Sequence, residues 1–347
     1  MVRLVDIASA VGVHPSTVSR VLNGEVGHSL RPETVERILT EARARGYRPN
    51  ALARALRQHR AGALTFVVPM VRNPIWVQLQ RGALLRAAEC GYVVMIMEEP
   101  TEDPKPPGAY GYLVTESRTD GLLLATALRG GRGTALRGGS GTAQPDEALS
   151  AVPHVYVNRR GPDQGNDVVM DEAAAVRLFL DHVAGLGHRS VLLIDGRREV
   201  DTVYRRAAAT RRHCAALGLT AVIRHADATE AGGYAVIRRR LAAGPLPTAI
   251  GVGSIEQVYG ALAALRDARI AVPGAVSLVS LDEDESLAYL DVPVTSICMP
   301  LAELGAAAVD ALIARIDGTG GSDVLIGEPM TLVRRGSVGP PPRERSA

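Results

Sequence analysis

The sequence predicts an α/β protein in which a small, all-α N-terminal head precedes a larger body of parallel sheets covered by helices. Hydrophobic residues make up 46% of the 347 positions, which is enough for a sizeable core and indicates more than one domain. From residue 61 onward, apolar runs of strand length alternate with longer helical segments. That alternation is typical of buried parallel strands joined by covering helices. In the first 60 residues, apolar side chains recur at helical spacing instead.

The body contains eight apolar runs of strand length. We expect these strands at 63–71, 92–97, 121–127, 154–158, 190–195, 221–226, 248–253 and 276–282. Between them lie segments such as 75–91, 172–187 and 254–270, whose amphipathic spacing is that of helices that cover a sheet. Eight strands over this length fit two Rossmann-like lobes better than one.

The N-terminal stretch VRLVDIASAVGVHPSTVSRVLNGE predicts two short helices joined by a turn. Gly12 has the conformational freedom that ends a helix. Pro15 suits the first position of the next helix, because its missing N–H has no partner to lose there. The inward-facing stripes would be Val5, Ile7, Ala8 and Val11 in the first helix and Val18, Val21 and Leu22 in the second.

Polar side chains occupy the other faces of the second helix, namely Ser16, Thr17, Ser19, Arg20 and Asn23. A helix-turn-helix places its second helix in the major groove of DNA, with the N-terminal residues at base edges. The first 60 residues contain ten arginines against five carboxylates, whereas the whole chain carries a net charge of only +2. A basic head on a slightly acidic body indicates double-stranded DNA as the partner of the head. A small amphipathic hairpin with a polar outer face is the alternative.

The stretch VDIASAVGVHPSTVSRVLNG closely resembles the head of the LacI/GalR family of bacterial transcriptional regulators. The segment ETVERILTEARARGYRPNALARALR is similar to the family's third helix, its Gly-Tyr-x-Pro-Asn link and its hinge helix. The candidate DNA-binding residues of the head are therefore Ser16, Thr17, Arg20 and Asn23. In the hinge, the resemblance implies that Asn50 caps the helix and that Ala53 and Leu56 enter the minor groove, where a leucine wedge can bend the duplex.

Two positions of the head depart from the family pattern. The family usually has a serine as the N-cap of the second helix, where this sequence has His14. The family's cap of the third helix falls on Arg31, a residue that caps poorly. These departures bear on fine base specificity and not on DNA binding itself.

The resemblance continues to about residue 335 and implies a two-lobed core similar to a periplasmic sugar-binding protein. It divides the chain into a DNA-binding head at 1–49, a hinge helix and linker at 50–60, an effector-binding and dimerisation core at 61–335, and a disordered tail at 336–347. The chain is expected to cross between the lobes near 158–162, 291–294 and 318–323. The proline-rich tail lacks leucine heptads, so a homodimer on a near-palindromic operator is expected and not a tetramer.

Ligands of open α/β sheets bind beyond the carboxyl ends of the strands, and the candidate effector-binding residues lie there. They are Ile75 and Trp76 in an Asn-Pro-Ile-Trp segment, Asn158, Arg206 at the family's effector arginine, Ser254, and Asp282 at the family's effector aspartate. An aromatic face, a donor and an acceptor suit a small hydroxylated effector such as a sugar. Core packing of Trp76 and an interlobe salt bridge between Arg206 and Asp282 are the alternatives.

The sequence favours no catalytic function. It lacks a G-x-S-x-G nucleophile elbow, a phosphate loop and a complete GxGxxG fingerprint, so no cofactor is expected. With no apolar run of membrane-spanning length and no signal segment at the N-terminus, a cytoplasmic protein is expected. A solute-binding protein without a regulatory role and a Rossmann-type enzyme are the alternatives. The duplicated TALRGG segment at 126–141 is interpreted as a glycine-rich surface loop of unassigned function.

Overall fold

The computed structural model divides the chain into two compact units, Met1–Ala61 and Gly62–Ala347. It describes residues 2–22, 30–47, 60–69, 73–99, 110–116, 118–125, 149, 152–161, 165–327 and 329–342. Several predictions lie outside the described residues: Asn23, Asn50, Ala53, Leu56 and the glycine-rich segment 126–141.

The N-terminal unit contains the predicted helix-turn-helix. It consists of α1 (Leu4–Val11), α2 (Pro15–Leu22) and α3 (Pro32–Ala44), which share one small apolar core. Gly12 ends α1 with a positive φ of 71°, and Pro15 begins α2, as the sequence predicts. Ile7, Val18 and Ile38 are fully buried in this core. The inward position predicted for Val5 is wrong, because its side chain is 53% exposed on the outer face of α1.

The first lobe of the larger unit is a six-stranded parallel sheet with the order β11-β5-β4-β3-β1-β2. Its strands are β1 (Ala63–Val68), β2 (Val93–Glu98), β3 (Gly121–Leu124), β4 (His154–Val157), β5 (Asp167–Met170) and β11 (Val324–Ile326). Helices α5 (Pro74–Glu89) and α12 (Leu301–Ile316) pack closely against each other beside this sheet, and α6 (Tyr112–Thr115) is a single turn. Every side chain of β1 is buried, as expected for a central parallel strand.

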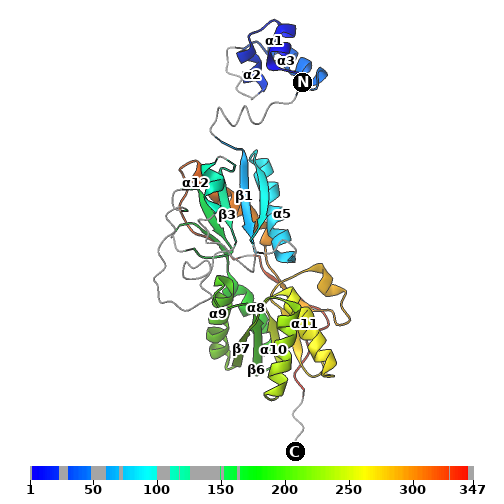
Figure 1. Cartoon of the computed structure of the whole chain (residues 1–347). Helices are drawn as coiled ribbons and strands as arrows, with labels where there is room; N and C mark the ends of the chain where they lie inside the picture. Colours follow the sequence, from blue (N-terminus) through cyan, green and yellow to red (C-terminus); the bar gives the residue numbers. More distant parts are fainter. Residues whose placement is uncertain are drawn as a thin grey trace, which may run out of the picture. The chain divides into compact units, whose positions relative to one another are not determined.

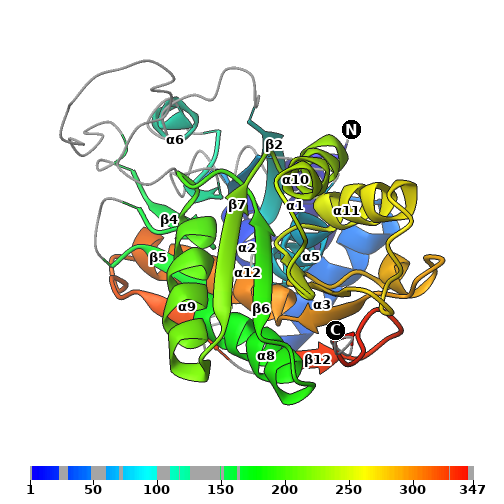
Figure 2. The same cartoon turned by 90° about the horizontal axis from the view of Figure 1, so that it is seen from below.

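The second lobe is a six-stranded sheet with the order β12-β10-β9-β8-β6-β7. Its strands are β6 (Ser190–Asp195), β7 (Thr220–His225), β8 (Ala249–Val252), β9 (Ser277–Ser280), β10 (Thr295–Cys298) and β12 (Thr331–Val333), of which β12 runs antiparallel to β10. Figures 1 and 2 show α8 (Glu172–Gly185) and α9 (Asp201–Leu217) on one face, and α10 (Glu230–Ala242) and α11 (Ile255–Asp267) on the other. A short 3-10 helix, η2 (Glu285–Ala288), follows β9.

The three crossings between lobes come later in the chain than the sequence predicts. They follow β5, β10 and β11, instead of falling near 158–162, 291–294 and 318–323. Each difference has the same cause, because one short strand of three or four residues still belongs to the lobe that the chain was expected to have left. Strands this short, without alternation, give little periodic signal.

The prediction of a disordered tail is wrong for residues 336–342. Ser337 is fully buried, its Oγ accepts from the Thr295 backbone N–H at 2.9 Å, and its carbonyl accepts from the Leu278 N–H at 2.9 Å. The Gly339 carbonyl lies 2.9 Å from Nε2 of the buried His188, which also bonds the hydroxyls of Thr248 and Ser277. This segment therefore satisfies polar groups of the second lobe that burial would otherwise leave unpaired.

Candidate functional site

Helix α2 presents a polar surface to solvent. Ser16 and Arg20 are exposed and Thr17 is half-buried, whereas Val18 and Val21 on the opposite face are buried in the small core. The apolar stripe thus fixes which way the hydroxyls and the guanidinium point. A short helix with exposed donors of this kind can reach phosphates and base edges in a major groove.

His14 serves as the cap of α2 in place of the family's serine. Its Nδ1 accepts from the Ser16 backbone N–H at 3.3 Å and lies 2.7 Å from the Ser16 Oγ. The imidazole therefore both satisfies a free amide of the first turn and orients the Ser16 hydroxyl. Arg31, by contrast, makes no side-chain capping bond at the start of α3, in agreement with the sequence prediction.

In the larger unit, Arg206 of α9 lies at the centre of a buried cluster of carboxylates. Its Nε donates to Glu172 at 2.5 Å, its Nη2 to Asp282 at 3.0 Å, and its Nη1 to the carbonyl oxygen of Gly253 at 2.7 Å. A third carboxylate, Asp195 at the end of β6, lies 3.9 Å from Nη1. All four charged side chains are at most 7% exposed.

Burial governs the protonation of this cluster. It raises the pKa of Asp282 to about 7, although the charge of Arg206 opposes that shift. Burial likewise raises the pKa of Asp195. For Arg206, burial lowers the pKa, but the charges of Glu172 and Asp282 outweigh it and leave the pKa raised. Glu172, Asp195 and Asp282 each keep one buried oxygen that has no hydrogen-bond partner among the described residues, so these oxygens can accept further hydrogen bonds.

A second group of residues joins the two lobes around Trp76, the only tryptophan of the chain. The guanidinium of Arg159 lies 5.4 Å from the centroid of the Trp76 ring. The Nη1 of Arg159 donates to Oγ1 of Thr202 on α9 at 3.2 Å and to the carbonyl oxygen of Asn158 at 2.8 Å. Asn158 has a positive φ of 50°, and its Oδ1 accepts from the Met170 N–H at 3.4 Å.

Not all of the predicted effector residues take part in these two groups. Ser254 caps α11, where its hydroxyl accepts from the Gln257 N–H. Ile75 is half-buried in the first turn of α5, and its N–H donates to the side chain of Asn73. Asn73 in turn donates to Glu256 across the lobes at 3.2 Å, so this part of the cleft is closed by direct contacts.

The sequence prediction missed Glu172, Asp195 and Thr202. Asp195 carried a usable signal, because it directly ends a buried strand and so lies at the sheet edge where ligands bind. Glu172 and Thr202 stand in the first turns of α8 and α9, where an acid or a hydroxyl is ordinary for a helix start. Their position alone therefore gives no functional signal.

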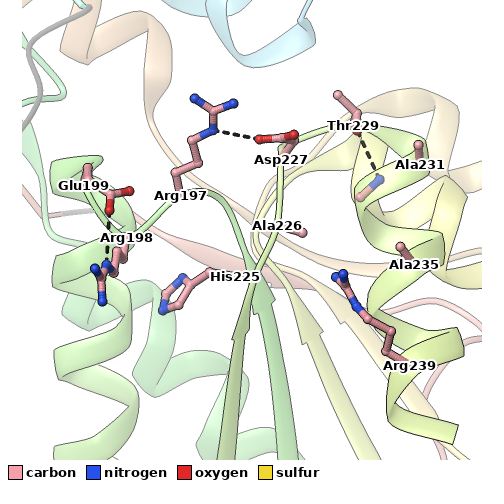
Figure 3. A pocket seen from close by; sticks show the side chains of 11 residues that line it. Arg197, Arg198, Glu199, His225, Ala226, Asp227, Thr229, Ala231, Ala235 and Arg239 are labelled. Carbon is pink, nitrogen blue, oxygen red and sulfur yellow. Dashed lines mark hydrogen bonds and ion pairs between the residues drawn. The ribbon is translucent and has the colours of Figure 1, made fainter. Parts of the chain in front are cut away.

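A separate depression of about 570 Å³ lies at the carboxyl ends of β6 and β7 and is drawn in Figure 3. Arg197 pairs with Asp227 at 2.7 Å and Arg198 with Glu199 at 3.1 Å, and these exposed pairs form much of its rim. None of the predicted site residues lines it. Across the described part of the chain, no His, Cys, Asp and Glu side chains are arranged to hold a metal ion, and no helix is long and apolar enough to cross a membrane.

Comparisons with known proteins agree with both units. Residues 3–50 match the family described as bacterial regulatory proteins, lacI family, and residues 180–338 match a periplasmic binding protein-like domain. The HTH-type transcriptional regulator MalR of Streptomyces coelicolor is 30% identical over 357 residues, which cover 99% of this chain and 98% of the relative. The ribose operon repressor of Escherichia coli is 25% identical over 324 residues, which cover 91% of this chain and 93% of the repressor.

Solved structures show the same fold. The Lac repressor dimer bound to operator and the anti-inducer ONPF superposes with a TM-score of 0.78 at 21% identity, over 97% of this chain and 99% of that chain. The complex of the regulator CelR with cellobiose gives a TM-score of 0.69 at 23% identity, over 97% and 100% of the two chains. With a relative of 30% identity along almost its whole length, the chain belongs to the LacI family and is a helix-turn-helix transcriptional regulator.

Proposed function

We propose that the protein binds a near-palindromic operator as a homodimer, represses transcription in the cytoplasm, and changes its operator affinity when a small hydroxylated effector binds between the core lobes. The observation that carries the proposal is the exposed polar surface of α2, with Ser16 and Arg20 presented on a capped and packed helix. Neither side chain belongs to the apolar core of the head.

The proposed DNA contacts divide between the head and the hinge. They are Ser16, Thr17, Arg20 and Asn23 in the first, and Asn50, Ala53 and Leu56 in the second. Arginine reads guanine through two parallel hydrogen bonds in the major groove, and serine and threonine bond either bases or phosphates. The structures of the Lac repressor with operator DNA support this proposal by likeness of fold.

The homodimer is supported by an apolar surface on the first lobe. Large side chains of α5 and of the neighbouring edge strand β2 are exposed: Val77, Leu84, Leu85, Val93, Met95 and Ile96. Exposed apolar clusters of this kind typically mark a protein interface. Two-fold pairing of a second copy there would present two heads to the two half-sites of a palindromic operator.

The proposed effector cleft contains Ile75, Trp76, Asn158, Arg206, Ser254 and Asp282. The carboxylates around Arg206 have unpartnered oxygens that can accept from hydroxyls, which supports a hydroxylated ligand. The complex of CelR with cellobiose is a case of such a ligand on the same fold. No cofactor or catalytic role is proposed.

The test is operator selection from a random duplex pool with the full chain, followed by anisotropy titrations on the selected site. Arg20→Ala should weaken binding by about 1–3 kcal/mol and relax specificity at one base position per half-site. Arg43→Ala on α3 is the matched control, since it removes the same charge from another helix of the head, and it should not change which bases are selected. Enrichment of no duplex at low salt would overturn the proposal.

A further inference from the structure

Arg159 is a buried cation that lacks an ionic partner. The residue is only 9% exposed, and no carboxylate of the described residues lies within ion-pair distance of its guanidinium. Its hydrogen bonds to Thr202 and Asn158 both use Nη1, so Nε and Nη2 donate to no other described residue. Burial, and next the charge of Arg205, lower its pKa to about 10, although the carboxylates of Asp201 and Glu172 oppose that shift, and the group remains charged at neutral pH.

Arg205 has the same property to a lesser degree. Its Nε pairs with Asp201 at 2.7 Å and its Nη1 donates to the Met170 carbonyl at 2.6 Å, but its buried Nη2 finds no partner in the described part of the chain. Thr202 and Arg205 are three residues apart on α9 and so share one face of the helix. Arg159, bonded to that Thr202, therefore brings a second guanidinium with unused donors to the same face.

Three other carboxylates gather around Arg206, the next residue of α9 after Arg205. Glu172, Asp195 and Asp282 surround Arg206, and each has one buried oxygen that accepts no hydrogen bond from a described residue. Arg205 and Arg206 are consecutive residues of α9, and the charges of Glu172 and Arg206 reach Arg159, so the spare donors and the spare acceptors belong to one neighbourhood.

An unpaired buried cation is costly and persists where it has a function, which for a guanidinium is often the bidentate binding of an oxyanion. We propose that the effector is a hydroxylated oxyanion, either a sugar acid or a sugar phosphate. Its anionic group binds Arg159 and Arg205, and its hydroxyls donate to Asp282 and the neighbouring carboxylates. This inference rests on the proposed function, and it narrows the ligand to an anionic class.

A purely structural role for Arg159 makes a different prediction. In that role, its guanidinium would hold the lobes together through its contacts with the Trp76 ring and Thr202. Loss of these contacts would then destabilise the protein when no ligand is added. As an anion-binding group it is a buried charge with no carboxylate of the described residues within ion-pair distance, so its replacement by a methionine of similar length should not lower the unfolding temperature.

The experiment uses the full chain, with thermal unfolding and ligand titration followed by the fluorescence of Trp76. The probes are matched sets at equal ionic strength: glucose, gluconate and glucose 6-phosphate; galactose, galactonate and galactose 6-phosphate; ribose, ribonate and ribose 5-phosphate. The variants are Arg159→Met and, as the control, Arg160→Met at the exposed neighbouring position.

We expect at least one anionic probe to raise the unfolding temperature of the wild type, and its neutral counterpart to have little effect. Arg159→Met should weaken that anion roughly thirty-fold or more, whereas Arg160→Met leaves it unchanged. The carboxylate and phosphate sets distinguish the two sources of the oxyanion. Without ligand, Arg159→Met should unfold no earlier than the control.

Three results would overturn the proposal: no anionic probe binds at millimolar concentration, anion binding survives Arg159→Met, or the ligand-free Arg159→Met protein loses stability that the control retains. Operator titrations on the same samples separate this outcome from failure of the proposed function. A neutral sugar that binds and shifts operator affinity would refute the anionic class and leave the regulator intact. Absence of operator binding would refute the regulator itself.

Discussion

Replacing Arg206 with methionine should strongly destabilise the larger unit, because it removes the cation around which three buried carboxylates gather. Glu172 and Asp282 are direct partners at 2.5 and 3.0 Å, and neither is more than 1% exposed. Methionine keeps most of the side-chain length, so the change tests charge and hydrogen bonding more than volume.

The expected magnitude follows from these contacts. Removing one member of a buried ion pair costs about 3–5 kcal/mol, because the other charge is left buried and unpaired. The lost bond to the Gly253 carbonyl adds about 1 kcal/mol. For a unit of this size, each kcal/mol corresponds to roughly 2 °C, so the unfolding temperature should fall by about 10 °C.

The assay is thermal unfolding read by Trp76, which lies in the larger unit and is the only tryptophan of the chain. Arg238→Met is the matched control, since Arg238 is exposed on α10.

The stability that Arg206→Met loses should depend on pH. Burial already raises the pKa of Asp282 to about 7, and without Arg206 nothing opposes that shift. When folding raises the pKa of a carboxyl, the stability of the folded protein falls as the pH rises from near 4 through that folded pKa.

The loss in Arg206→Met should therefore be largest above pH 7 and smaller at pH 5, where the folded state can hold protons on the carboxyls. A variant that unfolds within 2 °C of the control at pH 8 would refute the argument. So would a deficit that stays constant between pH 5 and pH 8, because it would show that the cluster is not held by charge.

Four further changes have equally definite outcomes. Burial lowers the pKa of His188, so the unfolded chain binds a proton near pH 6.5 that the folded one does not, and stability should fall as the pH drops below that value; urea titrations of His188→Gln should show a flatter dependence. Gly260→Ala places a methyl group against the Glu230 carbonyl where α10 meets α11, and calorimetry should show a loss of about 1–3 kcal/mol. Ser337→Ala leaves the buried Thr295 N–H without its acceptor and should lower the free energy of unfolding by about 1–3 kcal/mol in the same measurement. A disordered tail would give no loss of stability. Asp282→Asn should abolish the effect of an effector on operator affinity in anisotropy titrations while leaving operator binding itself near wild type.

The parts of the fold that the sequence predicts are those with a strong local signal. Gly12 ends α1 and Pro15 begins α2, and the eight apolar runs became strands β1 to β4 and β6 to β9 of the two sheets. The short strands β5, β10 and β11 could not be predicted, because three or four residues carry little pattern of their own and only pairing with neighbouring strands defines them. Those three strands account for all the errors in the lobe crossings.

The candidate site divides in the same way. Resemblance brought Arg206 and Asp282 to one place, where the structure shows them in contact at 3.0 Å. It gave no reason to add Glu172, since an acid in the first turn of a helix is explained by the helix dipole alone. Nor could it show that the hydroxyl of Ser254 is used to cap α11. The local sequence already explains Glu172 and Ser254 as residues at helix starts. Their roles in the site depend on tertiary contacts, which the local sequence does not show.

The closed cleft also limits how an effector can act. Arg159 with Thr202, and Asn73 with Glu256, join the lobes by direct hydrogen bonds. A ligand that merely replaced these bonds with equal ones would have the same affinity for both lobe arrangements, and would shift nothing. An oxyanion at Arg159 differs in this respect, because it would neutralise a guanidinium that contact between the lobes removes from solvent. Its binding energy therefore depends on closure, which is the differential affinity that regulation of operator binding requires.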